Sequence, residues 1–114
     1  MTDLFVQGVL AHLVADWFLQ NEWQATRKAD LRHPAAWVHA GCHLAILLLL
    51  AFPWPWAVGL AVVHALVDTR VPLQWWRRTL RQTTEGPMAV HVEIWQDQAA
   101  HVLCIAVAAH LAGG

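Results

Sequence analysis

Charged side chains are scarce in this sequence. They make up 13% of the 114 residues, against about 25% in a typical soluble domain. Tyrosine is absent, and the two cysteines, Cys42 and Cys104, both lie within apolar segments, so nothing indicates a disulfide framework. The formal net charge of −1 gives no reason to expect a nucleic-acid partner. The N-terminal segment lacks a basic start and carries His12 and Asp16 inside its apolar stretch, so we do not expect a signal peptide.

Apolar residues dominate what is present. Hydrophobic side chains account for 58% of the chain and include eight tryptophans, a residue favoured at membrane interfaces. Four apolar segments stand out, at about residues 4–19, 35–52, 56–67 and 88–112. A spanning helix needs about 20 residues, so the third segment must borrow from its flanks, and polar residues interrupt every segment. We expect an all-α fold in one domain over residues 1–114, a four-transmembrane-helix bundle, with a soluble helical bundle as the alternative.

The basic residues all lie in two of the three connections between these segments. The first and third connections hold all seven of them, which are Arg27, Lys28, Arg32, Arg70, Arg77, Arg78 and Arg81. A soluble bundle would scatter such charges along its helix faces. The positive-inside rule places both connections in the cytoplasm, and it puts both termini and the Pro53-Trp54-Pro55 turn outside. Residues 73–80, rich in tryptophan and arginine, predict a short interfacial helix between the third and fourth spanning helices.

Each apolar segment contains, at its core or its edge, two potential metal ligands four residues apart. The pairs are His12 with Asp16, His39 with His43, His64 with Asp68, and Asp97 with His101. This spacing places both side chains on one helix face, about one turn apart. Imidazole and carboxylate together suit zinc, iron or manganese. The pattern therefore predicts that these eight residues bind one or two divalent metal ions, with zinc the first choice.

The four pairs are expected to meet at one depth. In the predicted topology they all fall in the cytoplasmic half of the bundle. They also recur in two hairpin halves, about residues 1–52 and 53–114, because His12-Leu-Val-Ala-Asp16 resembles His64-Ala-Leu-Val-Asp68. Buried carboxylates at bilayer depth are costly. Two divalent ions with a bridging hydroxide would neutralise the three aspartates of the pairs, so the charge favours two ions over one.

Two further residues have more than one interpretation. Glu93 lies one helical turn before Asp97, where it serves either as a general acid or base, as a further ligand, or as an interfacial carboxylate. Cys42 precedes His43 and is either a soft ligand or a small packing residue. The eight paired residues themselves also have a non-catalytic interpretation, a buried polar network that holds membrane helices together. Serine, threonine, asparagine or glutamine would do this at lower cost.

These motifs resemble a family of small bacterial and phage membrane proteins known as domain of unknown function 3307. The resemblance covers nearly the whole chain and rests on Ala11-His12-Leu-Val-Ala-Asp16-Trp-Phe-Leu-Gln20, His39 to His43, His64 to Asp68, and Asp97-Gln98-Ala-Ala-His101. The family is similar to predicted inner-membrane metal-dependent hydrolases, which place histidine and aspartate within membrane helices. The resemblance implies a multi-pass protein of the bacterial inner membrane with a hydrolytic activity.

The leading functional hypothesis is a metal-dependent hydrolase whose site faces the cytoplasmic leaflet. A site at that depth suits an amphiphilic substrate, such as a phospholipid or a lipid-linked phosphate, and the arginines of the third connection would hold its phosphate. Membrane lipids are the expected partners, and a homo-oligomer is a further expectation. A metal transporter or sensor, a haem-binding bundle and a non-catalytic polar-cored bundle are the alternatives.

Overall fold

The computed structural model describes residues 3–82 and 85–114. Within these ranges every regular element is helical and no strand occurs. The long elements are α1 (Leu4–Leu13), which continues through the π-helical segment η1 (Val14–Leu19), α3 (Pro34–Leu49), α4 (Trp54–Asp68) and α6 (Ala89–Leu111). The short helices are α2 (Glu22–Arg27) and α5 (Val71–Thr79). The all-α prediction is confirmed, and α5 stands where the short helix over residues 73–80 was predicted, whereas α2 was not predicted.

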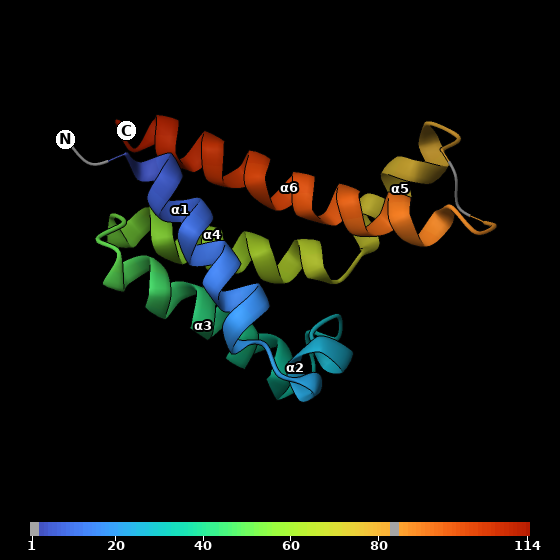
Figure 1. Ribbon diagram of the computed structural model, residues 1–114, viewed down its shortest axis with the longest axis horizontal. Coiled ribbons are helices and arrows are strands. Elements are labelled where there is room, and N and C mark those ends of the chain that lie inside the picture. The colour runs from blue at the N-terminus through green and yellow to red at the C-terminus, as the bar shows by residue number, and fades with distance from the viewer. Residues whose placement is uncertain (1–2, 83–84) are drawn as a thin grey trace.

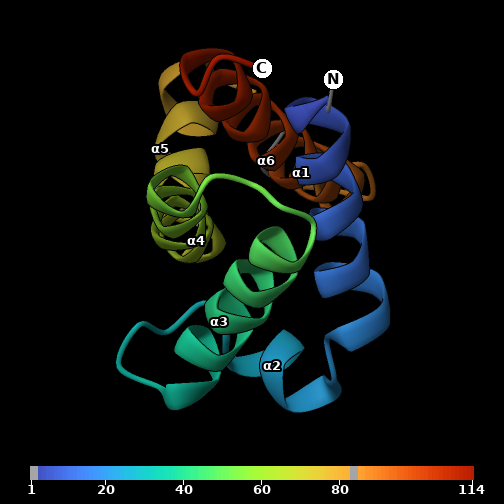
Figure 2. The same cartoon turned by 90° about the vertical axis from the view of Figure 1, so that its left-hand side faces the viewer.

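The long helices form a ring in the order α1, α3, α4, α6. Each packs against the two beside it in the ring, and Figure 2 shows the four viewed from one end. Both termini and the α3–α4 turn lie at the same end of the bundle, and α2 and α5 lie away from that end (Figure 1). The two connections that carry the basic residues are therefore separated from the termini and from the Pro53-Trp54-Pro55 turn.

Local sequence signals account for where several helices begin. Oδ1 of Asp3 accepts backbone N–H groups from the first turn of α1. Oδ1 of Asn21 accepts the backbone N–H of Gln24 at 2.9 Å and so caps α2. Pro34 and Pro55 lie in the first turns of α3 and α4, where the fixed φ of proline suits a helix and its missing N–H costs nothing.

Many large apolar side chains lie on the outside of the bundle. Buried positions are held mainly by alanine, histidine and aspartate, whereas large apolar side chains cover the outside, among them Phe18 (82% exposed), Leu49 (78%) and Trp95 (71%). Soluble monomers rarely expose extensive apolar surface. Among the described residues no single helix combines the length and hydropathy that crossing a bilayer requires, but α4 and α5 together do so across a bend of 59°. The four-transmembrane arrangement stays a prediction.

An apolar core occupies the end of the bundle nearest the termini. It joins all four long helices and the α3–α4 turn, and consists of Leu4, Ala11, Leu47, Phe52, Ala57, Leu60, Ile105, Ala108 and Ala109. Many of these side chains are alanine, which lets the helix backbones approach closely. The buried histidines and aspartates lie beyond this core, in the part of the bundle toward α2 and α5.

Helix α3 ends at a residue in the left-handed conformation, Ala51, with φ of 63°. The N–H of Phe52 donates to the carbonyl of Leu47 at 2.9 Å, the pattern of a Schellman motif, in which glycine is usual. A Cβ in this conformation costs about 1 kcal/mol. We expect Ala51→Gly to raise the free energy of unfolding by about that amount in a denaturant titration. Ala45→Gly, at an exposed site inside α3, should instead lower the free energy of unfolding by about 1 kcal/mol. If both substitutions changed the free energy of unfolding equally, the left-handed conformation assigned to Ala51 would be contradicted.

Candidate metal centre

Seven buried polar side chains converge between the four long helices. They are His12 and Asp16 from α1 and η1, His39 and His43 from α3, His64 and Asp68 from α4, and His101 from α6, none more than 8% exposed. The eighth residue of the predicted set, Asp97, is only partly buried. The i, i+4 spacing brings the members of each pair to one face, and the ring of helices turns these four faces toward a common centre.

Asp16, His39, His43 and His64 form the first group of donor atoms. Oδ1 of Asp16 lies 2.9 Å from Nε2 of His43 and 3.1 Å from Nε2 of His39. Nε2 of His64 lies 3.0 Å from Nε2 of His39 and 3.8 Å from Oδ1 of Asp16. Tetrahedral zinc, with ligand bonds of about 2.0–2.1 Å, holds its donor atoms about 3.3 Å apart. The spacing of this group is therefore close to that of a metal site, and its four donors all lie within 4.8 Å of one another.

His64, Asp68 and His101 form a second group, also within 4.8 Å. Oδ2 of Asp68 lies 2.8 Å from Nε2 of His64, and its Oδ1 lies 3.5 Å from Nε2 of His101. Among the described residues, both Asp68 oxygens and Nε2 of His101 are buried without a hydrogen-bond partner. Unsatisfied buried polar atoms are rare and costly. Since these atoms can donate electron pairs, a cation would satisfy them.

The two remaining predicted ligands support the donor groups without joining either one. Nε2 of His12 lies 2.9 Å from Oε1 of Gln98, to which it donates, and 3.4 Å from Oδ2 of Asp16. The backbone carbonyl of Asp97 accepts Nδ1–H of His101 at 2.8 Å, which leaves the lone pair of that imidazole on Nε2. Gln98 also donates to the Asp97 carboxylate at 3.2 Å. Of the eight predicted ligands, six lie in the donor groups and two lie beside them.

Residues outside the predicted set hold the centre in place. Nδ1 of His39 donates to Oε1 of Gln24 at 3.1 Å, so its Nε2 is free to face the donor group. Such outer hydrogen bonds fix the tautomer and orientation of a ligating imidazole. Gln24 belongs to α2 and is itself buried. The Nζ of Lys28, which follows the same helix, lies 3.8 Å from Oδ1 of Asp68 and offsets part of the negative charge.

A π-helical segment positions Asp16. Segment η1 follows α1 directly and contains Asp16 in its first turn. A π turn holds one more residue than an α turn and occurs often at functional sites. Asp16 is the most shared group of the centre, because its carboxylate lies within 4.0 Å of four imidazoles, those of His12, His39, His43 and His64.

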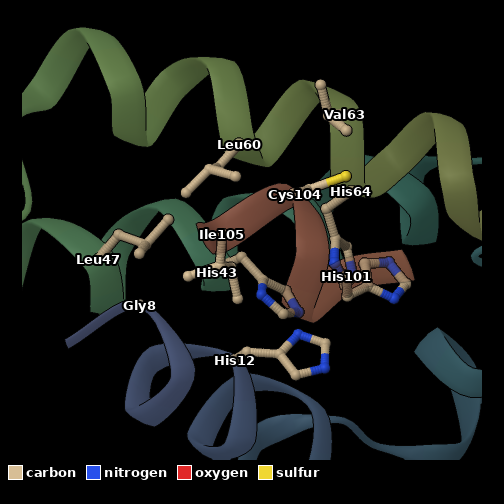
Figure 3. Close-up of a pocket in the computed structure, with 10 residues that line it drawn as sticks. All are labelled: Gly8, His12, His43, Leu47, Leu60, Val63, His64, His101, Cys104 and Ile105. Atoms are coloured by element: carbon tan, nitrogen blue, oxygen red, sulfur yellow. The ribbon is translucent and has the colours of Figure 1, made fainter. Parts of the chain in front are cut away.

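The histidines of four helices face one another on the side toward the apolar core. Figure 3 shows His12, His43, His64 and His101 around a small cavity, and its volume of about 20 Å³ is enough for one water molecule. The ring centroids of His43 and His64 lie 3.6 Å apart. Cys104 lines this cavity, whereas Cys42 does not. In neither donor group does a cysteine take part.

On its other side the centre borders an open cleft of about 500 Å³. All three aspartates of the predicted set lie in its wall, together with Gln20, Glu93 and the cations Lys28, Arg70 and Arg77. Oε1 of Glu93 lies 3.3 Å from NH1 of Arg70, so Glu93 is an ion-paired residue of the cleft and not a member of a donor group. The arrangement places a ligand-sized space directly against carboxylates of both groups.

Helices α1 and α6 meet where Gly8 faces Ile105. A Cβ at Gly8 would overlap Cγ2 of Ile105, and the approach also places the ring centroids of His12 and His101 5.1 Å apart, one turn further along α1. We expect Gly8→Ala to lower the free energy of unfolding by about 1–3 kcal/mol. Gly41→Ala in α3, where a Cβ meets open space, should instead raise it by up to about 1 kcal/mol. Thermal unfolding of the pair tests this contrast, and stabilisation by both would refute it.

The fold and the centre together define a small all-α bundle with buried histidine and aspartate side chains of the kind that can hold a metal ion. Residues 4–113 match the model of a family of proteins of unknown function, DUF3307. The chain belongs to that family, as its motifs predicted. No curated protein and no solved structure shows a significant match to it.

Proposed function

We propose that this chain is a membrane-embedded, metal-dependent hydrolase that acts on an amphiphilic, phosphate-containing substrate near the cytoplasmic leaflet. The observation that carries the proposal is the meeting of buried, partly unsatisfied donor atoms with an open cleft. Asp16 and Asp68 belong to donor groups and also line that cleft. A network that only held helices together would need neither the unsatisfied atoms nor a space of about 500 Å³ beside them.

We divide the six donors into two sets of three, one from each helical hairpin, by assigning the shared His64 to the second set. The sets are Asp16, His39 and His43, and then His64, Asp68 and His101. Two nitrogen ligands and one carboxylate form a common catalytic zinc set, which leaves a position for water. We assign one divalent ion to each set, zinc before iron or manganese. His64 lies near both sets, so the two ions would occupy neighbouring positions.

Bound ions would supply a water of lowered pKa and a Lewis acid for the scissile group. The chain contributes the orientation of the ligands, through Gln24 on His39 and the Asp97 carbonyl on His101. Hydrolysis places the hydroxyl of water on phosphorus, breaks the phosphorus–oxygen ester bond and returns a proton to the leaving oxygen. Glu93 lies in the cleft wall, and we assign to it the transfer of that proton, with Arg70 holding it in place.

The exposed apolar surface supports a membrane location. Side chains such as Phe18, Leu49 and Trp95 are more than two-thirds exposed, and lipid would cover them as water cannot. The bent α4–α5 pair has the length and composition of a span, and its bend lies beside the cleft, where Arg70 and Leu73 contribute to the wall. In such a setting the cleft would open toward the leaflet next to the basic connections.

Elemental analysis of purified protein tests the metal assignment. We expect two equivalents of metal in the unaltered protein and about one in Asp16→Ala and in Asp68→Ala, because each change removes the carboxylate of one set. His110→Ala, an exposed histidine of α6, is the matched control and should keep both ions. Metal below stoichiometric amounts in the unaltered protein, after growth with zinc, iron and manganese, would sink the proposal.

Transport of the metal is less well supported than hydrolysis. A transported ion needs a polar route to the far side of the membrane. Between the centre and the terminal end of the bundle, the described residues instead pack an apolar core that includes Leu47, Leu60 and Ile105. Metal uptake by sealed liposomes that contain the protein would reverse this ranking.

A further inference from the structure

Arg77 is a buried arginine whose head group borders the cleft. It is 6% exposed, and its NH1 donates to Oε1 of Gln96 at 3.1 Å. Gln96 is held in turn by a hydrogen bond to Gln82. A guanidinium offers five N–H donors, and among the described residues this is the one hydrogen bond that the Arg77 head group makes. Gln96 thus orients Arg77, while the other donors of its head group have no partner among residues 3–82 and 85–114.

The other two cations of the cleft already have carboxylate partners. Lys28 lies 3.8 Å from Asp68, and Arg70 lies 3.3 Å from Glu93. Within the part of the chain that the structure describes, Arg77 has no carboxylate within 4.0 Å. A buried cation without a counter-ion is unfavourable, so a ligand in the cleft that brought negative charge to Arg77 would be bound preferentially.

Helix α5 separates this cation from an apolar groove. Arg77 lines the cleft, whereas the next residue, Arg78, lines a groove of about 740 Å³ between α5 and α6 together with Trp75 and Trp76. Leu73 lines both cavities, so they adjoin at the start of α5. A phosphate beside Arg77 and apolar chains in the groove are therefore within reach of one amphiphilic molecule.

We propose that Arg77 binds the phosphate of a lipid phosphate monoester, and that the acyl chains of this lipid pass Leu73 into the α5–α6 groove. Arginine pairs with phosphate through two parallel, charge-assisted hydrogen bonds, and Gln96 presents the guanidinium to the cleft for that purpose. This assignment for Arg77 rests on the proposed hydrolase function in one respect, which is that the cleft is taken as the substrate site. It makes Arg77 a specificity-determining residue that does not touch the metal ligands.

Calorimetric titration of the zinc-loaded, detergent-solubilised protein tests the assignment with three probes. These are dihexanoyl phosphatidate, inorganic phosphate and dihexanoylglycerol. We expect phosphatidate to bind most tightly and Arg77→Gln to weaken it by 10-fold or more, as loss of a charge-assisted pair requires (about 1.5–3 kcal/mol). Arg27→Gln, at an exposed arginine of α2 that lines neither the cleft nor the groove, should change binding by less than about 2-fold. Ala99→Phe, which fills the groove, should weaken phosphatidate and leave inorganic phosphate unchanged.

Equal binding by the Arg77→Gln and Arg27→Gln variants would overturn the proposal. Dihexanoylglycerol binding as tightly as phosphatidate would also overturn it, and inorganic phosphate binding as tightly would overturn the lipid assignment in favour of the free ion. If Arg77→Gln does not fold, Arg77→Lys, which keeps the charge without the paired donors, should still bind more weakly than Arg27→Lys. The metal content of the same samples is also measured. If samples that retain no metal after zinc loading still bind phosphatidate in an Arg77-dependent way, the result would contradict the proposed metal-dependent hydrolase and would support the phosphate site alone.

Discussion

Removing divalent metal with a chelator is expected to lower the unfolding temperature of the purified protein by on the order of 15 °C. A ligand present at a thousand times its dissociation constant stabilises the folded state by about 4 kcal/mol, and about 1 kcal/mol corresponds to roughly 4–8 °C in a domain near this size. The loss is large here because both Asp68 oxygens and Nε2 of His101 are buried and have no hydrogen-bond partner among the described residues. Differential scanning fluorimetry before and after chelation measures the change.

The His64→Ala variant provides the control for this experiment. His64 lies in both donor groups, so its loss should weaken metal binding at each of them and leave little for a chelator to remove. We expect the chelator to shift the unfolding temperature of this variant by less than about a third of the shift in the unaltered protein. A shift of the same size in both proteins would show that the chelator acts elsewhere.

Replacing Asp68 by alanine is expected to reduce hydrolysis of phosphate monoesters by roughly 10³-fold. Electrostatic activation by a metal supplies several kcal/mol to a transition state, and each 1.4 kcal/mol is worth about tenfold in rate. Asp68 is the only carboxylate of the second donor group, so its loss removes that activation. Rates with p-nitrophenyl phosphate and with dihexanoyl phosphatidate give the measurement.

Asp97→Asn separates a ligand from a residue that supports one. The Asp97 carboxylate lies outside the donor groups and accepts a hydrogen bond from Gln98, and outer-shell changes typically cost 10- to 100-fold. Its backbone carbonyl, which orients His101, is retained in the variant. A loss in Asp97→Asn as large as that in Asp68→Ala would mean that Asp97 is itself a ligand.

The sequence alone predicted the parts of this site that depend on helical periodicity. Four residues make slightly more than one helical turn, so His39 with His43, or His64 with Asp68, had to share a face once a helix was assigned. The basic connections predicted which ends of the helices lie together. Both inferences use only local geometry and charge, which a single sequence contains.

The parts that depend on contacts between helices were not predictable in this way. Gln98 reaches His12 across 86 residues of chain, and Gln24 reaches His39 from a separate helix. Nothing in the spacing of either glutamine marks it as a partner of a histidine. A signal for α2 did exist, because an asparagine at position 21 with a glutamine three residues later is a common helix start.

The π-helical segment at residues 14–19 makes the length of the chain there part of the site. Each residue added to or removed from a helix rotates everything beyond it by about 100°. A single deletion between His12 and Asp16 would therefore turn the Asp16 side chain away from the other imidazoles while keeping every ligand in the sequence. Relatives that carry all eight predicted ligands, but in which the spacing from His12 to Asp16 differs by one residue, would lack the centre described for this chain.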